Sequence, residues 1–342
     1  MRYSWANTLL FILLIWQFVS GLWGLMTGVA DRYWVLWWHG LGGYAVGLIL
    51  FWKGAVILDT LKRRRFTWNT AVFLFLALLL LTILGTGFIW TTNGPIYLAG
   101  FSLINIHGHL SILLMPLLGW HVVARRFIFR VPQARDRRAA MRFAGFSLVA
   151  LLLGRLAERT KAATELPGAK RRFTGSYERG SFSGQFPQVS WLFDFPNPQR
   201  VDDWQLVLTG KVKTPLTFSY EAFTQLPTET ITTTLDCTGG WYTTQVWCGV
   251  KLGDLLDLAD VDAEAQSVTV EAVSGYKRRF PLSEARDYLL ALAVADEPLS
   301  HGHGYPVRLV APGRRGFEWV KWVVRIRVNG TSHIWQMPLP LQ

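Results

Sequence analysis

The first 160 residues alternate between long apolar runs and short polar connections. Four apolar stretches, 8–29, 34–58, 70–91 and 101–124, are each long enough to cross a hydrocarbon core of about 30 Å as a helix. A fifth stretch, 141–156, is shorter and is flanked by arginines. The pattern predicts an all-α transmembrane helix bundle of four helices, followed by a fifth helix that tethers the rest of the chain.

The second half has a finer pattern, in which short runs of alternating apolar and polar residues are separated by turn residues. Such runs predict β-strands, here at 204–210, 229–237, 267–275, 305–313 and 322–330. Two other runs, 251–259 and 281–290, have the spacing of short helices. Because strands and helices mix without a strict βαβ order, this half is predicted to be a compact α+β domain.

These patterns divide the chain into four parts. They are a transmembrane helix bundle (1–128), a basic loop with the fifth segment (129–160), a polar linker (161–185) and a globular domain (186–342). Lys and Arg outnumber Asp and Glu by 16 to 4 before residue 161, and the two classes are equal at 19 each after it. The net charge of +12 therefore belongs to the membrane half, and it does not indicate a nucleic-acid partner.

The basic residues also predict an orientation. The connections 61–66 and 124–142 are strongly basic, whereas 91–100 carries no charge. By the positive-inside rule the basic connections face the cytoplasm. Five crossings then place the globular domain on the outer, periplasmic face of the cytoplasmic membrane. If 141–156 instead lies along the membrane surface as an amphipathic helix, that domain stays in the cytoplasm.

Arg137 and Arg138, which precede the fifth apolar run, resemble a twin-arginine export signal placed inside the chain. Signals of that kind export domains that have already folded around a cofactor. A plain stop-transfer flank explains the same two arginines, so the export route stays open.

Histidines within the apolar stretches are candidate haem ligands, because ionisable residues in spans are rare and usually functional. His107 and His121 are 14 residues apart, which puts them about 40° apart on one helix face and about 21 Å apart along it. His39 enters its span at about the depth of His107. The two could clamp one haem b through their imidazoles. Lys53 stands where a fourth ligand would lie, so a second haem at His121 is incomplete.

The alternative for these histidines is a set of ordinary hydrogen-bonded side chains in a helix bundle. Their layout resembles the short b-type cytochrome modules that pass electrons between membrane quinone and an attached enzyme. The resemblance implies membrane lipid and quinone as partners. It also implies that no separate protein partner is obligatory, because the cytochrome is fused to the enzyme.

Cys237 ends a β-branched strand and is followed by Gly239, Gly240 and Trp241. The glycines make room for a bulky group beside the thiol. The chain has one other cysteine, Cys248. The residues alone leave a disulfide between the two open, since an exported domain permits one.

The motifs LDCTGGW, SGYKRRFPLSEARD and HGYPVRLVAPGRRGFEWVKW occur in this order over residues 200–330. In order and spacing they resemble the sulfite oxidase family of molybdopterin enzymes. The resemblance implies that Cys237 supplies a thiolate to molybdenum. It further implies that the molybdopterin and its phosphate are held by Cys237, Thr238, His303, Arg308, Gly316 and Lys321, while His301 and Tyr276 are candidates for the pocket rim.

The sequence departs from the sulfite-oxidising members at two places. It lacks their Arg-Asn-His element, with no arginine between 186 and 199, and it has Gly239-Gly240-Trp241 where they have Asn-Arg-Arg. Little sequence follows the Val-Lys-Trp motif, where the family has a dimerisation domain. These features make the chain more similar to the exported, methionine-sulfoxide-reductase-like branch.

The combined hypothesis is a membrane-anchored molybdopterin-dependent oxidoreductase that exchanges electrons with the quinone pool through haem b and reduces a small S-oxide. One alternative is oxidation of a small-molecule substrate, as in sulfite oxidase, with electrons passed to quinone. Another is a non-catalytic exported binding module on a membrane anchor.

Overall fold

The computed structural model describes residues 4–63, 68–124, 137–191 and 194–340. The chain divides into two compact units, Met1–Tyr177 and Glu178–Gln342. The finer boundaries expected at 128, 160 and 185 stay predictions. Each unit is described by itself.

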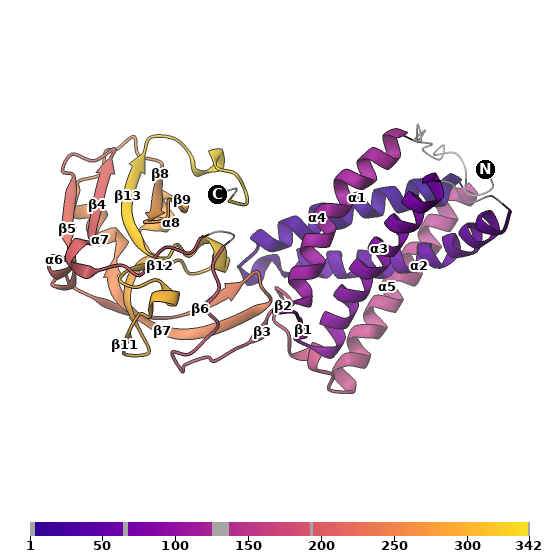
Figure 1. Ribbon diagram of the computed structural model, residues 1–342, viewed down its shortest axis with the longest axis horizontal. Coiled ribbons are helices and arrows are strands. Elements are labelled where there is room, and N and C mark those ends of the chain that lie inside the picture. The colour runs from indigo at the N-terminus through magenta and orange to yellow at the C-terminus, as the bar shows by residue number, and fades with distance from the viewer. Residues whose placement is uncertain (1–3, 64–67, 125–136, 192–193, 341–342) are drawn as a thin grey trace. The chain divides into compact units, whose positions relative to one another are not determined.

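The N-terminal unit consists of long helices (Figure 1). Their bounds are α1 Ser4–Met26, α2 Tyr33–Arg63, α3 Trp68–Asn93, α4 Leu103–Ala124 and α5 Arg137–Ala163, with short 3-10 turns at Ala30–Arg32 and Pro167–Lys170. A small hairpin, β1 (Tyr97–Leu98) and β2 (Phe101–Ser102), connects α3 to α4. Among the described residues, four segments are long and apolar enough to span a membrane: Ala6–Met26, Ala30–Phe51, Thr70–Asn93 and Leu103–Ala124. They overlap the first four stretches expected from sequence.

The fifth predicted segment forms the helix α5, but it is not among these four candidate spans. Charged residues, including Arg142 and Arg155, interrupt its apolar run. Arg137 and Arg138 begin the helix, and their side chains lie outside the described residues. Whether α5 crosses a membrane therefore stays a prediction.

Helix α5 runs antiparallel to α2. Near its start, Phe146 packs against the cluster that contains Ile49. Further along, a Cβ at Gly154 would lie 3.1 Å from Leu41, and the last turns share a cavity with Tyr33. The absence of a side chain at Gly154 permits this close approach. These contacts extend over most of the apolar part of α2, from Tyr33 to Ile49, so α5 packs alongside that part of the helix.

The stretch after α5 packs on the end of α3. The Trp90 indole donates a 2.8 Å hydrogen bond to the Gly175 carbonyl, and the Trp90 and Tyr177 rings pack edge to face at 5.2 Å. A Cβ at Gly168 would lie 2.0 Å from the Thr91 carbonyl oxygen, so only glycine fits there. Part of the expected linker is thus held against the helices of its own unit.

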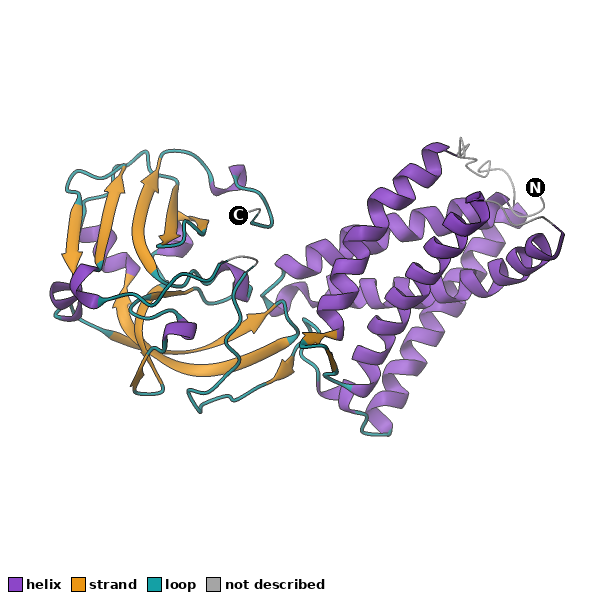
Figure 2. Cartoon of the chain, in the orientation of Figure 1, coloured by secondary structure: helices purple, strands orange, loops and turns teal. Residues whose placement is uncertain are grey.

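The C-terminal unit contains two β-sheets and short helices (Figure 2). In one sheet, β7 (Trp241–Lys251) lies between β6 (Glu229–Cys237) and β10 (Leu289–Val294), and β10 also pairs with β11 (Glu297–Pro298) and β12 (Arg308–Val310). The other sheet has the order β5 (Leu216–Ser219), β4 (Gln205–Gly210), β13 (Val323–Asn329), β8 (Ser267–Ala272), β9 (Lys277–Pro281). The remaining elements are β3 (Tyr177–Glu178), α6 (Tyr220–Thr224), α7 (Leu252–Leu258) and α8 (Leu282–Ala285).

One apolar core fills this unit, and its members include Trp247, Leu252, Phe280, Leu309 and Ile326. The α+β prediction is confirmed, as are strands within all five predicted runs and the helix at 251–259. The helix expected over 281–290 is wrong beyond its first turn. Only Leu282–Ala285 is helical, and Leu289 already begins β10, because this strand is buried on both faces and so shows no alternation.

Candidate functional site

Cys237 is the last residue of β6 and is cross-strand partner to Trp241, the first residue of β7. The turn between them is closed by Gly240, whose φ of +88° is readily adopted only by glycine and whose amide donates to the Cys237 carbonyl at 3.1 Å. The Gly239 amide donates to the Cys237 sulfur at 3.3 Å. Burial raises the pKa of the Cys237 thiol, although the Gly239 amide and Arg315 act in the opposite direction.

A buried ion pair braces this turn from the other side. Arg315 contacts the Asp236 carboxylate at 2.7 Å, with both side chains about 3% exposed, and it also donates to the Cys237 carbonyl at 3.2 Å. A Cβ at Gly316 would lie 3.1 Å from the Cys237 Cα, so the loop after β12 passes directly over the cysteine. Asp236 and Arg315 were not predicted from the sequence, although they directly precede the predicted site residues Cys237 and Gly316.

Arg308, on β12, is buried and forms no ion pair with a carboxylate among the described residues. It donates to the His303 carbonyl at 3.0 Å and lies over the rings of Trp247 and Trp319, with 5.0 and 5.7 Å to their centroids. Its Nε has no hydrogen-bond partner among the described residues. Burial lowers the pKa of Arg308 to about 9. A buried cation of this kind is a ready site for an anion.

Lys321 is a second buried cation, on which the charge of the Asp194 carboxylate acts. Its ammonium donates to the carbonyls of Val189 and Gly302 at 3.2 and 3.0 Å and to the Ser190 hydroxyl at 2.8 Å. Burial, together with the charge of Arg308, lowers the pKa of Lys321 to about 7. In the part of the chain that the structure describes, neither Lys321 nor Arg308 forms an ion pair with a carboxylate.

His303 stacks on Phe186 at a centroid distance of 3.9 Å and hydrogen-bonds its carbonyl through Nε2 at 3.1 Å. Burial is the main reason that the pKa of His303 is lowered to about 4, so the imidazole is neutral at pH 7. It lines a cavity of about 630 Å³ with residues from 179–188 and 294–300. Among the described lining residues, His303 is the one that sequence analysis selected.

The remaining candidates lie as follows. Thr238 is half-buried in the β6–β7 turn. His301 hydrogen-bonds the Pro196 carbonyl through Nε2 at 3.1 Å. Tyr276 is 5% exposed and donates to the Phe317 carbonyl, so it is interior rather than at a rim.

The disulfide alternative is wrong. Cys237 pairs with Trp241 at one end of the β6–β7 ladder, whereas Cys248 pairs with Thr230 near the other. Seven residues of strand separate Trp241 from Cys248, which corresponds to about 23 Å. Both side chains are thiols.

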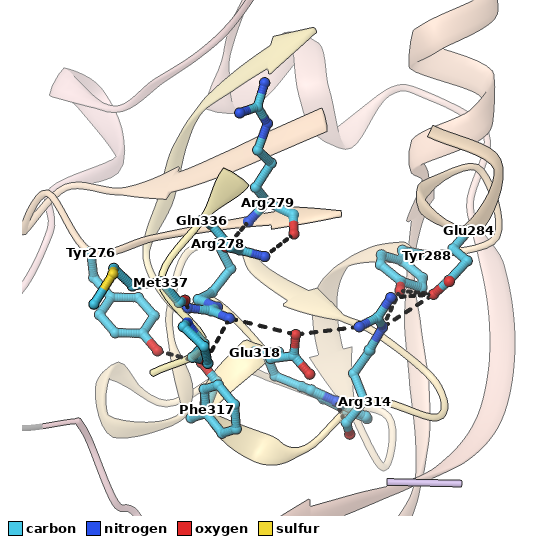
Figure 3. Close-up of polar contacts among 12 residues, drawn as sticks. Tyr276, Arg278, Arg279, Glu284, Tyr288, Arg314, Phe317, Glu318, Gln336 and Met337 are labelled. Atoms are coloured by element: carbon cyan, nitrogen blue, oxygen red, sulfur yellow. Dashed lines mark hydrogen bonds and ion pairs between the residues drawn. The ribbon is translucent and has the colours of Figure 1, made fainter. Parts of the chain in front are cut away.

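A charged network fixes the loop that carries Arg315 and Gly316 (Figure 3). Glu318 lies between Arg278 and Arg314, at 3.8 and 3.5 Å. Arg314 also binds Glu284 at 2.6 Å, and Arg278 donates to the carbonyls of Met337 and Pro338, both at 3.2 Å. The loop is thus tied to α8, to β9 and to the segment after β13.

In the N-terminal unit, His39 on α2 and His107 on α4 come together as the sequence predicted. Their ring centroids are 6.1 Å apart and the rings are nearly perpendicular, at 84°. The Nδ1 of His39 contacts the Ser20 hydroxyl at 3.1 Å, and that of His107 contacts the Ile83 carbonyl at 2.8 Å. Because each Nδ1 is already engaged, Nε2 is the nitrogen available for a metal.

Two glycines on the neighbouring helices α1 and α3 make room for these rings. A Cβ at Gly21 on α1 or at Gly87 on α3 would lie 3.0 Å from the Cε1 of His39 or His107, respectively. His109 is exposed and contacts the Asn105 carbonyl, while His121 lies in the last turn of α4. The structure therefore joins one histidine pair and does not join His121 to it.

Comparison with known proteins adds to this geometry. Residues 193–334 match the family described as "Oxidoreductase molybdopterin binding domain". The uncharacterized oxidoreductase YuiH of Bacillus subtilis is 32% identical over 143 residues, which cover 41% of this chain and 72% of YuiH.

Longer relatives match over part of their length. Nitrate reductase [NADH] of Spinacia oleracea is 30% identical over 44% of this chain and 19% of its own. Mitochondrial sulfite oxidase of Drosophila melanogaster is 29% identical over 50% of this chain and 36% of its own. Among solved structures, the sulfane dehydrogenase SoxCD from Paracoccus pantotrophus matches with 31% identity over 40% of each chain and a TM-score of 0.38.

The chain spans well under half of the nitrate reductase and sulfite oxidase that it matches, but nearly three quarters of YuiH. The non-catalytic binding module considered from sequence is excluded by these relatives. The chain belongs to the oxidoreductase molybdopterin-binding domain family, which includes sulfite oxidase and nitrate reductase, and it is a molybdopterin-dependent oxidoreductase.

Proposed function

We propose that this protein is a membrane-anchored oxidoreductase of the methionine-sulfoxide-reductase-like branch, which takes electrons from membrane quinol through a haem b in its own chain and reduces a small S-oxide. The observation that carries this proposal is the His39–His107 pair in the same chain as a molybdopterin-binding domain. An enzyme of this family needs an electron donor or acceptor, and the paired histidines supply a site for one.

The residues around Cys237 fit a molybdopterin. Cys237 would provide the thiolate, a soft ligand suited to a high-valent metal, and binding would displace the proton that burial keeps on the sulfur. Arg308 and Lys321 would hold the phosphate, whose negative charge complements the two buried cations. Thr238, His303 and Gly316 would complete the binding surface. When bound, the cofactor supplies a metal that exchanges an oxygen atom and electrons with the substrate.

The residues of the N-terminal unit fit a haem b. The rings of His39 and His107 lie 6.1 Å apart, and each would hold the iron through the Nε2 that the contact at its Nδ1 leaves available. Gly21 and Gly87 allow the two rings to occupy these positions, because a Cβ at either glycine would crowd the ring. When bound, the haem supplies a one-electron carrier between quinone and the molybdopterin domain.

The course of α5 supports placing the C-terminal unit on the outer face of the membrane. Because α5 runs antiparallel to α2, its end lies at the same end of the helices as the uncharged connection 91–100. The basic connections join the opposite ends of the helices. The positive-inside rule then assigns the end of α5 to the outside.

The test of the metal sites uses protein purified in detergent. We expect one Mo and one Fe per chain, together with a b-type band in the dithionite-reduced optical spectrum. Cys237→Ala should abolish turnover with a reduced dye and S-oxide substrates, while Cys248→Ala, the matched control, should retain it. Unchanged turnover in Cys237→Ala would rule out the role of this thiol.

The direction of electron flow is tested in the same preparation. We expect dye oxidation with methionine sulfoxide or dimethyl sulfoxide and no dye reduction with sulfite, because the turn after Cys237 carries Gly239, Gly240 and Trp241 and no arginine for an anionic substrate. Sulfite-dependent dye reduction would instead establish the oxidative alternative, with electrons passed to quinone.

A further inference from the structure

A second cavity, of about 480 Å³, lies in the N-terminal unit between the start of α2 and the end of α5, two helices that run side by side (Figure 1). It is lined by Tyr33, Trp34, Trp37, Trp38, Arg155, Glu158 and Arg159. Its size lies within the range of small-molecule sites, about 300–1,000 Å³. None of these residues takes part in the molybdopterin or haem sites described above.

The α2 side of the cavity is a set of aromatic rings. Trp34 packs edge to face on Trp23 at 5.1 Å, and Trp37 packs edge to face on Trp38 at 4.9 Å. These contacts restrain the rings. Even so, more than a third of the surface of each of the four aromatic residues is exposed: Tyr33, Trp34, Trp37 and Trp38. The exposed ring surfaces favour a flat, apolar ligand that can stack on them.

The α5 side supplies hydrogen-bond donors and one acceptor. Arg155 and Arg159 form no ion pair with the residues that the structure describes, so their guanidinium groups can donate to a ligand. Glu158 accepts from Lys161 at 3.0 Å and from Arg171 at 2.7 Å, one on each carboxylate oxygen. Both oxygens keep further acceptor capacity.

We propose that this cavity binds the head group of a membrane quinone. The ring would stack on the tryptophans, Arg155 and Arg159 would donate to the oxygens of the quinone, and Glu158 would accept from the hydroxyls of the quinol. Residues 33–38 lie within about 9 Å of His39 along the helix axis, so the ligand would sit beside the histidine pair. This assignment rests on the quinone exchange proposed above.

The groups on the α5 side favour a quinone over a lipid phosphate. A phosphate group accepts from arginine, but the Glu158 carboxylate would repel its negative charge. A quinone and its quinol together use both kinds of group. The aromatic rings also offer nothing specific to a phosphate group.

The test is photolabelling of the full-length protein in lipid nanodiscs with an azido-quinone, followed by peptide mapping. Label is expected on residues 33–38 and 155–159, and a short-chain quinone should compete for it. Arg155→Gln and Arg159→Gln should each weaken labelling about tenfold, as expected for loss of a charge-assisted hydrogen bond. Arg142→Gln, an exposed position on the same helix, should leave it unchanged.

Labelling elsewhere in the chain, or labelling equally strong in both cavity variants, would overturn the assignment. Competition by phosphatidylglycerol as effective as that by quinone would overturn it as well and identify a lipid site. The haem spectrum is recorded on the same sample. An intact haem without label at the cavity refutes this inference alone, whereas absence of haem refutes the proposed electron route independently of the labelled peptides.

Discussion

Lys321 and Arg308 are placed where a cation is costly. Removing a charge from water costs several kcal/mol when no partner replaces the lost hydration. The described surroundings of both residues offer carbonyls, a hydroxyl and aromatic rings. The Asp194 carboxylate acts on Lys321, but neither cation forms an ion pair with a described carboxylate. The pKa of each is accordingly lowered, to about 7 for Lys321 and about 9 for Arg308. A bound phosphate would restore the ordinary preference for the charged form.

This argument predicts a pH dependence of cofactor retention. Lys321 without a ligand loses its proton as pH rises through about 7, whereas beside a phosphate it would stay protonated. Binding above pH 7 then requires proton uptake, so affinity falls as pH rises. We expect pterin retained after dialysis to decrease between pH 6 and pH 9. In Lys321→Gln it should be low and nearly independent of pH.

Lys213→Gln provides the control, because Lys213 is an exposed lysine in a surface ion pair. It should show the wild-type pH profile. A profile for Lys321→Gln that parallels the wild type would show that Lys321 does not contact the phosphate.

At the level of the elements, the loop Arg314–Trp319 is important because it brings Arg315 and Gly316 against the Cys237 turn. Its own anchor is Glu318, 5% exposed between two arginines. Burial raises the pKa of Glu318 despite these two cations, and removal of its carboxylate would leave Arg278 and Arg314 facing each other. Loss of one partner from a buried ion pair typically costs about 3–5 kcal/mol.

We therefore expect Glu318→Ala to destabilise the C-terminal unit by roughly 3 kcal/mol and to lower the Mo content of the purified protein. Thermal unfolding and metal analysis measure the two effects. Glu264→Ala removes the same group from an exposed ion pair with Lys211 and should change neither quantity. Equal Mo content in the two variants would mean that the loop keeps its position without Glu318.

Sequence patterns predicted those elements whose periodicity is undisturbed. Strand β6 was found from its β-branched run, but β7 was not. Every second residue from Trp241 to Trp247 is buried, but these positions include Thr243 and Gln245, so the sequence has no apolar–polar alternation that matches the burial. Strand β10 was mistaken for helix because residues 289–291 are apolar on both faces.

Site residues were predictable from the sequence where the residue type alone suggests a ligand, as cysteine, arginine, lysine and histidine do. Cys237, Arg308 and Lys321 stood out in their motif, and the matching depth of His39 and His107 predicted their meeting. Asp236 and Arg315 were not predicted, because an ion pair between residues 79 positions apart has no local pattern. Burial of Tyr276 depends in the same way on tertiary packing.

At the scale of the whole molecule, the haem proposed at the histidine pair would make the chain its own electron-transfer partner. We expect His39→Ala or His107→Ala to remove the b-type band while leaving the Mo content unchanged, since the two cofactors lie in separate units. His109→Ala is a matched control on the same helix and should keep the band. Optical spectra and metal analysis of the three variants decide this. A band that persists without His39 would place the axial ligands elsewhere.

The direction of α5 makes a final prediction about the whole chain. If α5 crosses the membrane, Glu264 in the C-terminal unit and Trp68 at the start of α3 lie on opposite sides, because Trp68 follows the basic connection 61–66. Both are exposed enough for labelling, Glu264 with 83% of its side chain and Trp68 with 79% of the residue accessible. In intact spheroplasts, an impermeant maleimide should label Glu264→Cys and leave Trp68→Cys unlabelled.

Permeabilisation should then expose Trp68→Cys, and the parent protein, which contains Cys237 and Cys248, gives the background. Labelling of Glu264→Cys only after permeabilisation would mean that α5 lies along the cytoplasmic surface. The substrate would then be cytoplasmic, because the molybdopterin domain follows α5 and shares its side of the membrane. Sidedness therefore decides which pool of the proposed S-oxide substrates the enzyme would reach. The four apolar helices do not decide it, because the molybdopterin domain follows the arginine-flanked fifth helix.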